Sequence, residues 1–367
     1  GVVPMSTPNT RDAAPTLDQI HADLLEIDPT LRGQSKRPVT LPAEYATLQQ
    51  LNTDLKRINA TFMSQARALY QDVIPPDLNS RLKALDETSA VGGQSRKTYL
   101  TFAAGINALE LETRLNVSDN LLSPADQQML ENCSQGPSFR PGMYALAFTY
   151  QEQTVMFAGA FVLTRQANPV VDSLEAAPPV GPILLFTPAR GLEAFDSLHD
   201  LDQGLQSAMA RATGRAEFNR HLPVRYQHLD TVDIWPLALL PFQDKPLFEH
   251  VYQALLDKRE QDINYALSHA DTTHIKEHLD NAIQAALPDL TLRLDFRAQR
   301  LLERDLFYAL PDWYRSASTA QKDALAQHLR NYQQARQDLL DLMEPAGSLT
   351  ALARQQWLER LSEDLEI

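Results

Sequence analysis

Apolar residues recur at every third or fourth position through most of this chain, which is the period of an amphipathic helix. In the first half, these runs predict helices over residues 16–27, 42–70, 77–87, 96–115 and 123–133. In the second half, they predict helices over residues 216–222, 244–268, 272–287, 318–344 and 349–367. A Thr or Ser with Gln three positions later forms a capping box, which marks helix starts at Thr16 and Ser318.

The pattern changes in the middle of the chain, where aromatic and β-branched residues dominate. Residues 143–150 and 154–164, joined by the polar Gln151-Glu152-Gln153, predict a β-hairpin. The apolar run from Ile183 to Phe186 predicts a third strand of the same sheet. Residues 168–182 hold four prolines and little periodicity, which predicts an exposed loop.

The stretch from residue 181 to 205 predicts a strand, a turn and a helix in succession. Thr187-Pro188 ends the strand, and the helix is expected to follow Gly191. Glu193 and Asp196 then suit the positive end of the helix dipole, so Asp196 is the expected helix-start residue. The apolar face of this helix steps by three or four residues through Phe195, Leu198, Leu201, Leu205 and Met209.

Residues 290–296 allow two interpretations. Leucines and Phe296 alternate with polar residues, as in a strand, but the same residues fit the early start of a helix that continues through Leu306.

Together these patterns predict an α+β fold that is predominantly helical, with a small central antiparallel sheet. We expect a flexible tail over residues 1–15, a helical part over 16–140, a central hairpin, strand and helix over 141–230, and a helical part over 231–367. These parts are expected to form one continuous folded unit. Because the sequence stops inside an amphipathic helix, it is expected to be a piece of a longer protein.

Composition narrows the classes of function. The formal net charge of -14, without a local basic patch, argues against nucleic acid as a partner. Cys133 is the single cysteine, which excludes an internal disulfide framework and a thiolate zinc site. No run of about 18 apolar residues, signal peptide or phosphate-binding glycine motif is present, and no cofactor is expected.

The segment His274-Ile275-Lys276-Glu277-His278 matches the H-x-x-E-H pattern of inverted zinc peptidases, in which two imidazoles hold zinc and a carboxylate activates water. The helical phase argues against this chemistry. Ile275, Leu279, Ile283 and Leu287 define the buried stripe, so His274 and His278 lie to one side and Glu277 points away. We expect solvated flank residues, with His274 and His278 as an alternative metal site.

Two other features could bind or react. Ile234 to Phe242 is apolar and contains prolines, so Trp235, Leu239, Leu240 and Phe242 are candidates to contact a partner protein or a membrane surface. A buried connection between subdomains is the competing interpretation. Cys133 could be a nucleophile only beside a base, and its neighbours Asn132 and Ser134 form no such signature.

Several short blocks, in this order, are similar to the dermonecrotic-toxin-type N-terminal region of large secreted proteins of Gram-negative bacteria. The resemblance extends from about Thr16 to Leu340. The blocks are Pro141-Gly142-Met143-Tyr144, the run from Ala158 to Thr164, the run from Leu184 to Pro188, Gly191 with Glu193 to Leu198, Leu310-Pro311-Asp312-Trp313-Tyr314, and Ala317-Ser318.

The resemblance implies a non-catalytic module for targeting, delivery or binding of a host partner. In such proteins the region precedes leucine-rich repeats and a ubiquitin-ligase or toxin domain, so downstream domains of the same chain are further expected partners. It also implies secretion without a cleavable signal peptide, and delivery into a host or target cell. A zinc-dependent hydrolase that uses His274, Glu277 and His278, and a structural spacer, are the alternative functions.

Overall fold

The computed structural model describes residues 17–29, 43–88, 96–135, 140–165, 171–177, 181–242, 246–290, 292–343 and 349–365. The chain divides into two compact units, one formed by residues 39–300 and the other by residues 1–38 together with 301–367. The predicted tail and the capping residue Thr16 lie outside the described residues. The predicted divisions at residues 140 and 230 rest on the sequence pattern and stay predictions.

The unit of residues 39–300 contains a five-stranded antiparallel sheet with the order β4-β3-β2-β1-β5. The predicted hairpin and third strand are confirmed, and the fold is α+β with a central sheet in a mostly helical chain. The strands are β1 (Gly142–Tyr150), β2 (Gln153–Thr164), β3 (Ile183–Thr187), β4 (Gly191–Phe195) and β5 (Ala238–Pro241).

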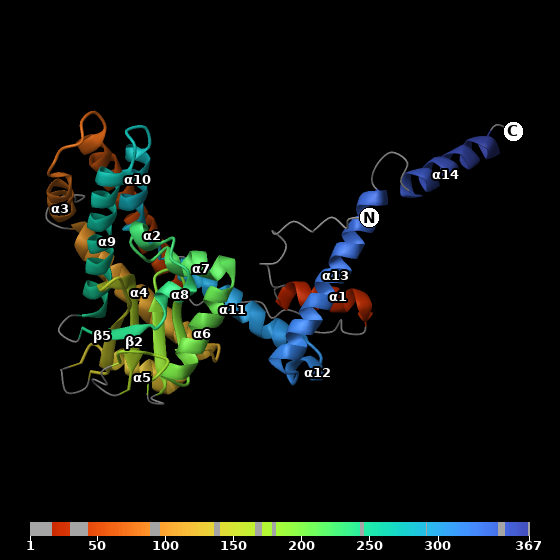
Figure 1. Ribbon diagram of the computed structural model, residues 1–367, viewed down its shortest axis with the longest axis horizontal. Helices are drawn as coiled ribbons and strands as arrows, with labels where there is room; N and C mark the ends of the chain where they lie inside the picture. The colour runs from red at the N-terminus through yellow and green to blue at the C-terminus, as the bar shows by residue number, and fades with distance from the viewer. Residues whose placement is uncertain are drawn as a thin grey trace. The chain divides into compact units, whose positions relative to one another are not determined.

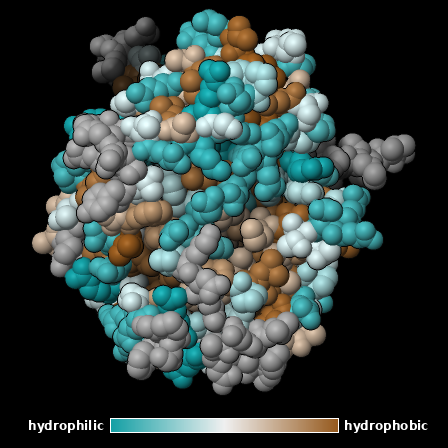
Figure 2. Space-filling model, turned by 90° about the vertical axis from the view of Figure 1, so that its left-hand side faces the viewer, coloured by the Kyte–Doolittle hydropathy of each residue, from teal (hydrophilic) through white to brown (hydrophobic). Residues whose placement is uncertain are grey.

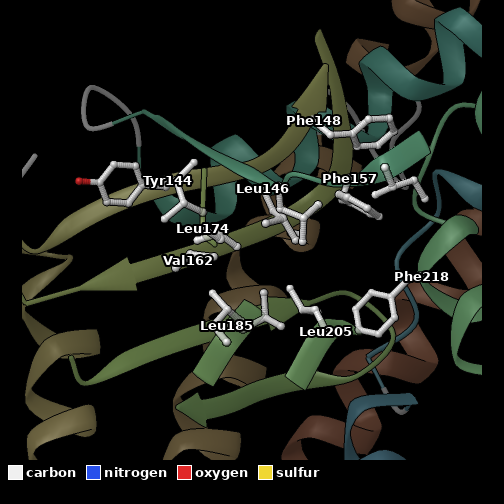
Figure 3. Packing of buried hydrophobic residues seen from close by; sticks show 14 of the residues in the cluster. Tyr144, Leu146, Phe148, Phe157, Val162, Leu174, Leu185, Leu205 and Phe218 are labelled. Atoms are coloured by element: carbon white, nitrogen blue, oxygen red, sulfur yellow. The ribbon is translucent and has the colours of Figure 1, made fainter. Parts of the chain in front are cut away.

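Helices cover both faces of this sheet, which is why its central strands are apolar almost without interruption. On one face, Tyr144, Leu146 and Val162 pack with α6 (Leu198–Ala210) and α7 (Ala212–Asn219) through Leu205 and Phe218 (Figure 3). On the other face, alternate residues of the same strands, such as Met143, Phe161 and Leu163, pack with Met129 of α5 (Pro124–Asn132) and Val251 of α9 (Leu247–His269).

Beyond the sheet, α9 continues into a helical bundle (Figure 1). Its second half contributes Ile263 and Ala266 to a core shared with α2, α3 and α10. A further cluster joins α2 to α4 through Leu55 and Leu111. The helices of the bundle are α2 (Glu44–Tyr70), α3 (Leu78–Thr88), α4 (Arg96–Ser118) and α10 (Ile275–Ala285).

Two predictions for the centre of the chain are wrong. Residues 191–195 form the short strand β4, and α6 begins only at Leu198, where the Ser197 hydroxyl accepts a hydrogen bond from the amide of Asp200. Ser197, rather than Asp196, is therefore the N-cap. Phe195 and Leu198 are packing residues, as expected, since both pack in the sheet core.

The proline-containing segment before β3 is not simply an exposed loop. Val171 forms an antiparallel bridge with Leu239, and the amide of Leu174 donates to the carbonyl of Leu237 at 2.8 Å. Both Val171 and Leu174 are buried in the sheet core. The described part of this segment therefore packs along β5.

Residues from 292 onward form a helix, α11 (Leu292–Ala309), so the helical interpretation of residues 290–296 is correct and the strand is wrong. The short helix predicted at 216–222 begins four residues earlier, as α7. Two short helical elements lie between α7 and β5 along the chain. They are the 3-10 helix η4 (Val224–Tyr226) and α8 (Thr231–Ile234).

In the other unit, the first helix of the chain packs on the helices near its end. Ile20 and Leu24 of α1 (Leu17–Ile27) share a core with Tyr314 of α12 (Asp312–Arg315) and Leu329 of α13 (Thr319–Met343). The Ser318 capping box is confirmed, because the amide of Gln321 donates to the Ser318 hydroxyl and the Gln321 side chain accepts from the Ser318 amide. The last helix is α14 (Leu349–Leu365).

Candidate binding sites

The four residues predicted to contact a partner or membrane lie at or beside β5, and most of their surface packs against other residues of the chain. The Trp235 indole donates a hydrogen bond to Asp202 at 2.8 Å, and Leu239 is buried in the sheet core. The Phe242 ring stacks on His250 with 3.7 Å between centroids. Leu240 is 36% exposed. In this conformation Leu240 is the residue of the four that offers an open apolar surface.

The H-x-x-E-H segment begins just before α10. The Nδ1 atom of His274 lies 2.9 Å from the Asp271 carboxylate, and this hydrogen bond raises the pKa of the exposed imidazole. Leu279 and Ile283 are buried, which confirms the predicted helical phase. Within the described ranges, no three His, Cys, Asp or Glu side chains are grouped so that they could hold a metal ion. The alternative site at His274 and His278 gains no support from this geometry.

Cys133 follows α5 and packs against the second face of the sheet. Its thiol donates to the Met129 carbonyl at 3.4 Å, and burial raises its pKa to about 12. A thiol with so high a pKa is protonated at neutral pH and is a poor nucleophile. The thiol borders a mostly apolar hollow of about 500 Å³ between α4, α5 and the start of α9.

Charged side chains are buried in the middle of α9, between its sheet-packed half and its bundle-packed half. Lys258 and Asp262 form an ion pair at 2.6 Å, and the other Asp262 oxygen accepts from the amide of Val224 at 2.8 Å. On the neighbouring helical face, Arg259 and Lys97 both pair with Asp86. Buried ions need such partners, because an unpaired charge in the interior is costly.

Two hollows lie beside Lys258. The first, which we name the apolar hollow, has a volume of about 300 Å³ and is bordered by the β3–β4 turn, α9 and the segment after α10. The second, the polar hollow, has a volume of about 510 Å³ and is bordered by Gln227, Tyr265, His269 and His278. Arg220, Lys258 and Ala285 line both.

His221 is a buried side chain that borders the apolar hollow. Burial lowers its pKa to about 4, with the nearby charges of Arg220 and Lys258 acting in the same direction. Its Nε2 atom is buried and finds no hydrogen-bond partner in the described part of the chain. The imidazole is therefore neutral at physiological pH, and since Lys258 is paired with Asp262, the uncompensated positive charge at this junction is that of Arg220.

On the unit of residues 39–300, exposed apolar side chains are scattered. The face seen in Figure 2 is mainly hydrophilic, and hydrophobic side chains show between the others as separate patches. Single exposed residues such as Val73 and Val232 are common on protein surfaces and need no partner.

On α13 and α14, large exposed apolar residues are frequent. Leu325 and Leu329 pack on α1, and Tyr332 and Gln333 donate hydrogen bonds to Glu26 and Asp23 of the same helix. Farther along α13, Leu339, Leu340 and Leu342 are exposed. Leu342 is 75% exposed, and Trp357 of α14 is 63% exposed. We name this set the uncovered stripe. It comprises Tyr332, Leu339, Leu340, Leu342, Leu352, Trp357, Leu358 and Leu361.

Comparisons with known proteins found no matching family model, no similar curated protein and no similar solved structure. None of the helices in the described ranges has the length and apolar character needed to cross a membrane.

The sequence pattern pointed to none of the residues at the junction of the two hollows. A Lys and an Asp four positions apart, as in Lys258 and Asp262, are common on solvated helix faces. Arg220 and His221 follow a short helix with no motif around them. The fold brings these residues together at the border of the two hollows.

Proposed function

We propose that this chain is a non-catalytic binding module of a secreted Gram-negative toxin or effector, and that the uncovered stripe docks a partner protein. The observation that carries the proposal is the stripe itself. Amphipathic helices bury their apolar face in a stable assembly, and a large exposed apolar set of this kind is typical of an interaction surface. The toxin or effector context rests on the resemblance of the short sequence blocks.

A protein partner fits the stripe better than a lipid surface does. Helices that lie on membranes carry many Lys and Arg residues on their polar face, which attract anionic lipids. Here acidic residues such as Asp338, Asp341 and Glu359 are interspersed with the basic ones. The chain as a whole has a net charge of -14, which repels an anionic surface. The core of a protein interface, by contrast, is enriched in aromatic residues such as Trp357 and depleted of charged ones.

The proposal is tested by affinity capture from host-cell lysate with the wild-type chain and two variants. Leu342→Asp places a charge in the stripe, whereas Val232→Asp places the same charge at an exposed valine on the other unit. We expect a protein that is retained by wild type and by Val232→Asp but is lost with Leu342→Asp. Equal capture by all three chains would contradict docking at the stripe.

Two further measurements separate the other occupants. Flotation with phosphatidylglycerol-containing vesicles should leave the protein in the soluble fraction. Sedimentation over a range of concentrations should show a monomer. Vesicle binding or self-association that Leu342→Asp removes would assign the stripe to lipid or to a second copy and overturn the proposal.

A further inference from the structure

The apolar hollow and the polar hollow meet at a positively charged junction. Arg220, Lys258 and Ala285 border both spaces, so a molecule in one hollow reaches the same side chains as a molecule in the other. With volumes of about 300 and 510 Å³, each hollow is of the size that holds small organic ligands. The side chains between the apolar and the polar hollow are thus Arg220 and the ion pair of Lys258 with Asp262.

The apolar hollow is suited to a hydrocarbon body. Its walls include Val251 and Leu255 of α9, Phe186 of β3, and Leu287 after α10. Two charged side chains also line this hollow, and both interact with other residues of the chain. Arg293 lies 3.5 Å from Glu112, and Asp289 likewise has an interaction partner. His221, neutral and buried, adds no charge to this wall. An alkyl chain placed here removes its apolar surface from water, and this burial favours binding.

The junction is suited to an anion. Arg220 is exposed, and its guanidinium forms no ion pair with any other residue that the structure describes. Lys258 is paired with Asp262, whose other oxygen is occupied by the Val224 amide. The acid at the junction is thus already engaged, and a ligand carboxylate or phosphate would meet an available guanidinium.

We propose that the two hollows form one site for a single-chain amphiphile with an anionic head. The alkyl chain of the ligand lies in the apolar hollow, and its carboxylate or phosphate monoester binds Arg220 at the junction. The polar hollow beyond it, with Tyr265 and Asn281 on its wall, accommodates water or a larger head group. This site is separate from the uncovered stripe and does not depend on the proposed function.

The test is isothermal titration of the full chain with dodecanoate and with dodecyl phosphate below their micellar concentrations. Acetate, inorganic phosphate and dodecyltrimethylammonium are the comparison probes. We expect saturable binding of at least one dodecyl anion at one molecule per chain, and at least tenfold weaker binding of all three comparison probes. Whichever dodecyl anion binds more tightly identifies the preferred head group.

Two variants and a matched control locate the site. Arg220→Gln should weaken binding of the dodecyl anion about tenfold or more, whereas Arg211→Gln at the other end of α7 should leave it unchanged. Ala285→Trp fills the junction from an exposed position and should abolish binding. Circular dichroism checks that each variant is folded. No binding by wild type, or equal binding by wild type, Arg220→Gln and Ala285→Trp, would overturn the assignment.

Discussion

The carboxylate of Glu112 on α4 accepts a hydrogen bond from the backbone amide of Leu192 on β4, with 2.6 Å between oxygen and nitrogen. The Arg300 guanidinium donates to the carbonyl of the same residue at 2.7 Å. Both backbone groups of Leu192 that point away from the sheet are therefore bound by charged side chains. An edge strand whose amide and carbonyl are engaged in this way is closed to pairing at that position.

Removing the Glu112 carboxylate should destabilise the fold strongly. In Glu112→Ala, the Leu192 amide loses its acceptor and the buried Arg293 loses its partner at 3.5 Å. We expect a loss of about 3–5 kcal/mol in the free energy of unfolding, measured by urea denaturation. Glu112→Gln keeps an acceptor oxygen, so its free energy of unfolding should lie between those of wild type and Glu112→Ala. A Glu112→Ala protein within about 1 kcal/mol of wild type would contradict this role.

Gly191 is required by the same contact. Its φ is +71°, and a Cβ atom built on it would lie 2.1 Å from the Glu112 Oε1 atom. We expect Gly191→Ala to lower the free energy of unfolding by about 2 kcal/mol or more, from backbone strain and from displacement of Glu112. The penalty should shrink when Glu112 is already alanine. Additive penalties in the double variant would show that the Glu112 contact is not the cause.

Acid should destabilise the fold through His221. The folded-state pKa is lowered from its ordinary value of 6.5 to about 4, so the unfolded chain binds the proton more readily. Stability from this group is complete above pH 6.5 and is lost as the pH falls toward 4, by about 3 kcal/mol in total. Urea denaturation of wild type and His221→Gln at pH 7.5 and 5 measures this effect. The variant should lose less stability on acidification, and an equal loss in both proteins would contradict the prediction.

The neighbours Leu239 and Leu240 on β5 should respond oppositely to a charge. Leu239 is 3% exposed within the sheet core, whereas Leu240 is 36% exposed. Leu239→Asp should lower the free energy of unfolding by several kcal/mol, because it buries an unpaired carboxylate. Leu240→Asp should cost about 1 kcal/mol or less. Thermal denaturation of the two variants compares them directly, and similar melting temperatures would show that β5 does not present these residues as described.

The long elements were predictable from the sequence, and the short edge strands were not. Helix α2 and the β1–β2 hairpin each span enough residues for the apolar period to be clear. Strand β4 has only five residues. It includes the charged Glu193, which forms an ion pair with Arg190. Its sequence therefore resembles the first turn of the helix that follows. Strand β5 was obscured by Pro236 before it and by Pro241 at its end.

The candidate sites were less predictable still, because distant segments build them. Arg259 meets Asp86 across 173 positions of the chain, and Glu112 meets Leu192 across 80 positions. The spacing of apolar residues along a helix or strand carries no information about pairs so far apart in the sequence. The uncovered stripe is an intermediate case. The apolar spacing of α13 and α14 was visible in the sequence, but the position at which α1 stops covering it was not.

Helix α9 has a consequence for how the unit of residues 39–300 comes apart. Val251 belongs to the core on one face of the sheet, and Ile263 belongs to the core of the helical bundle. Melting this helix would open both cores together and would release Lys258 and Arg259 from their buried partners. We therefore expect the sheet and the bundle to unfold together.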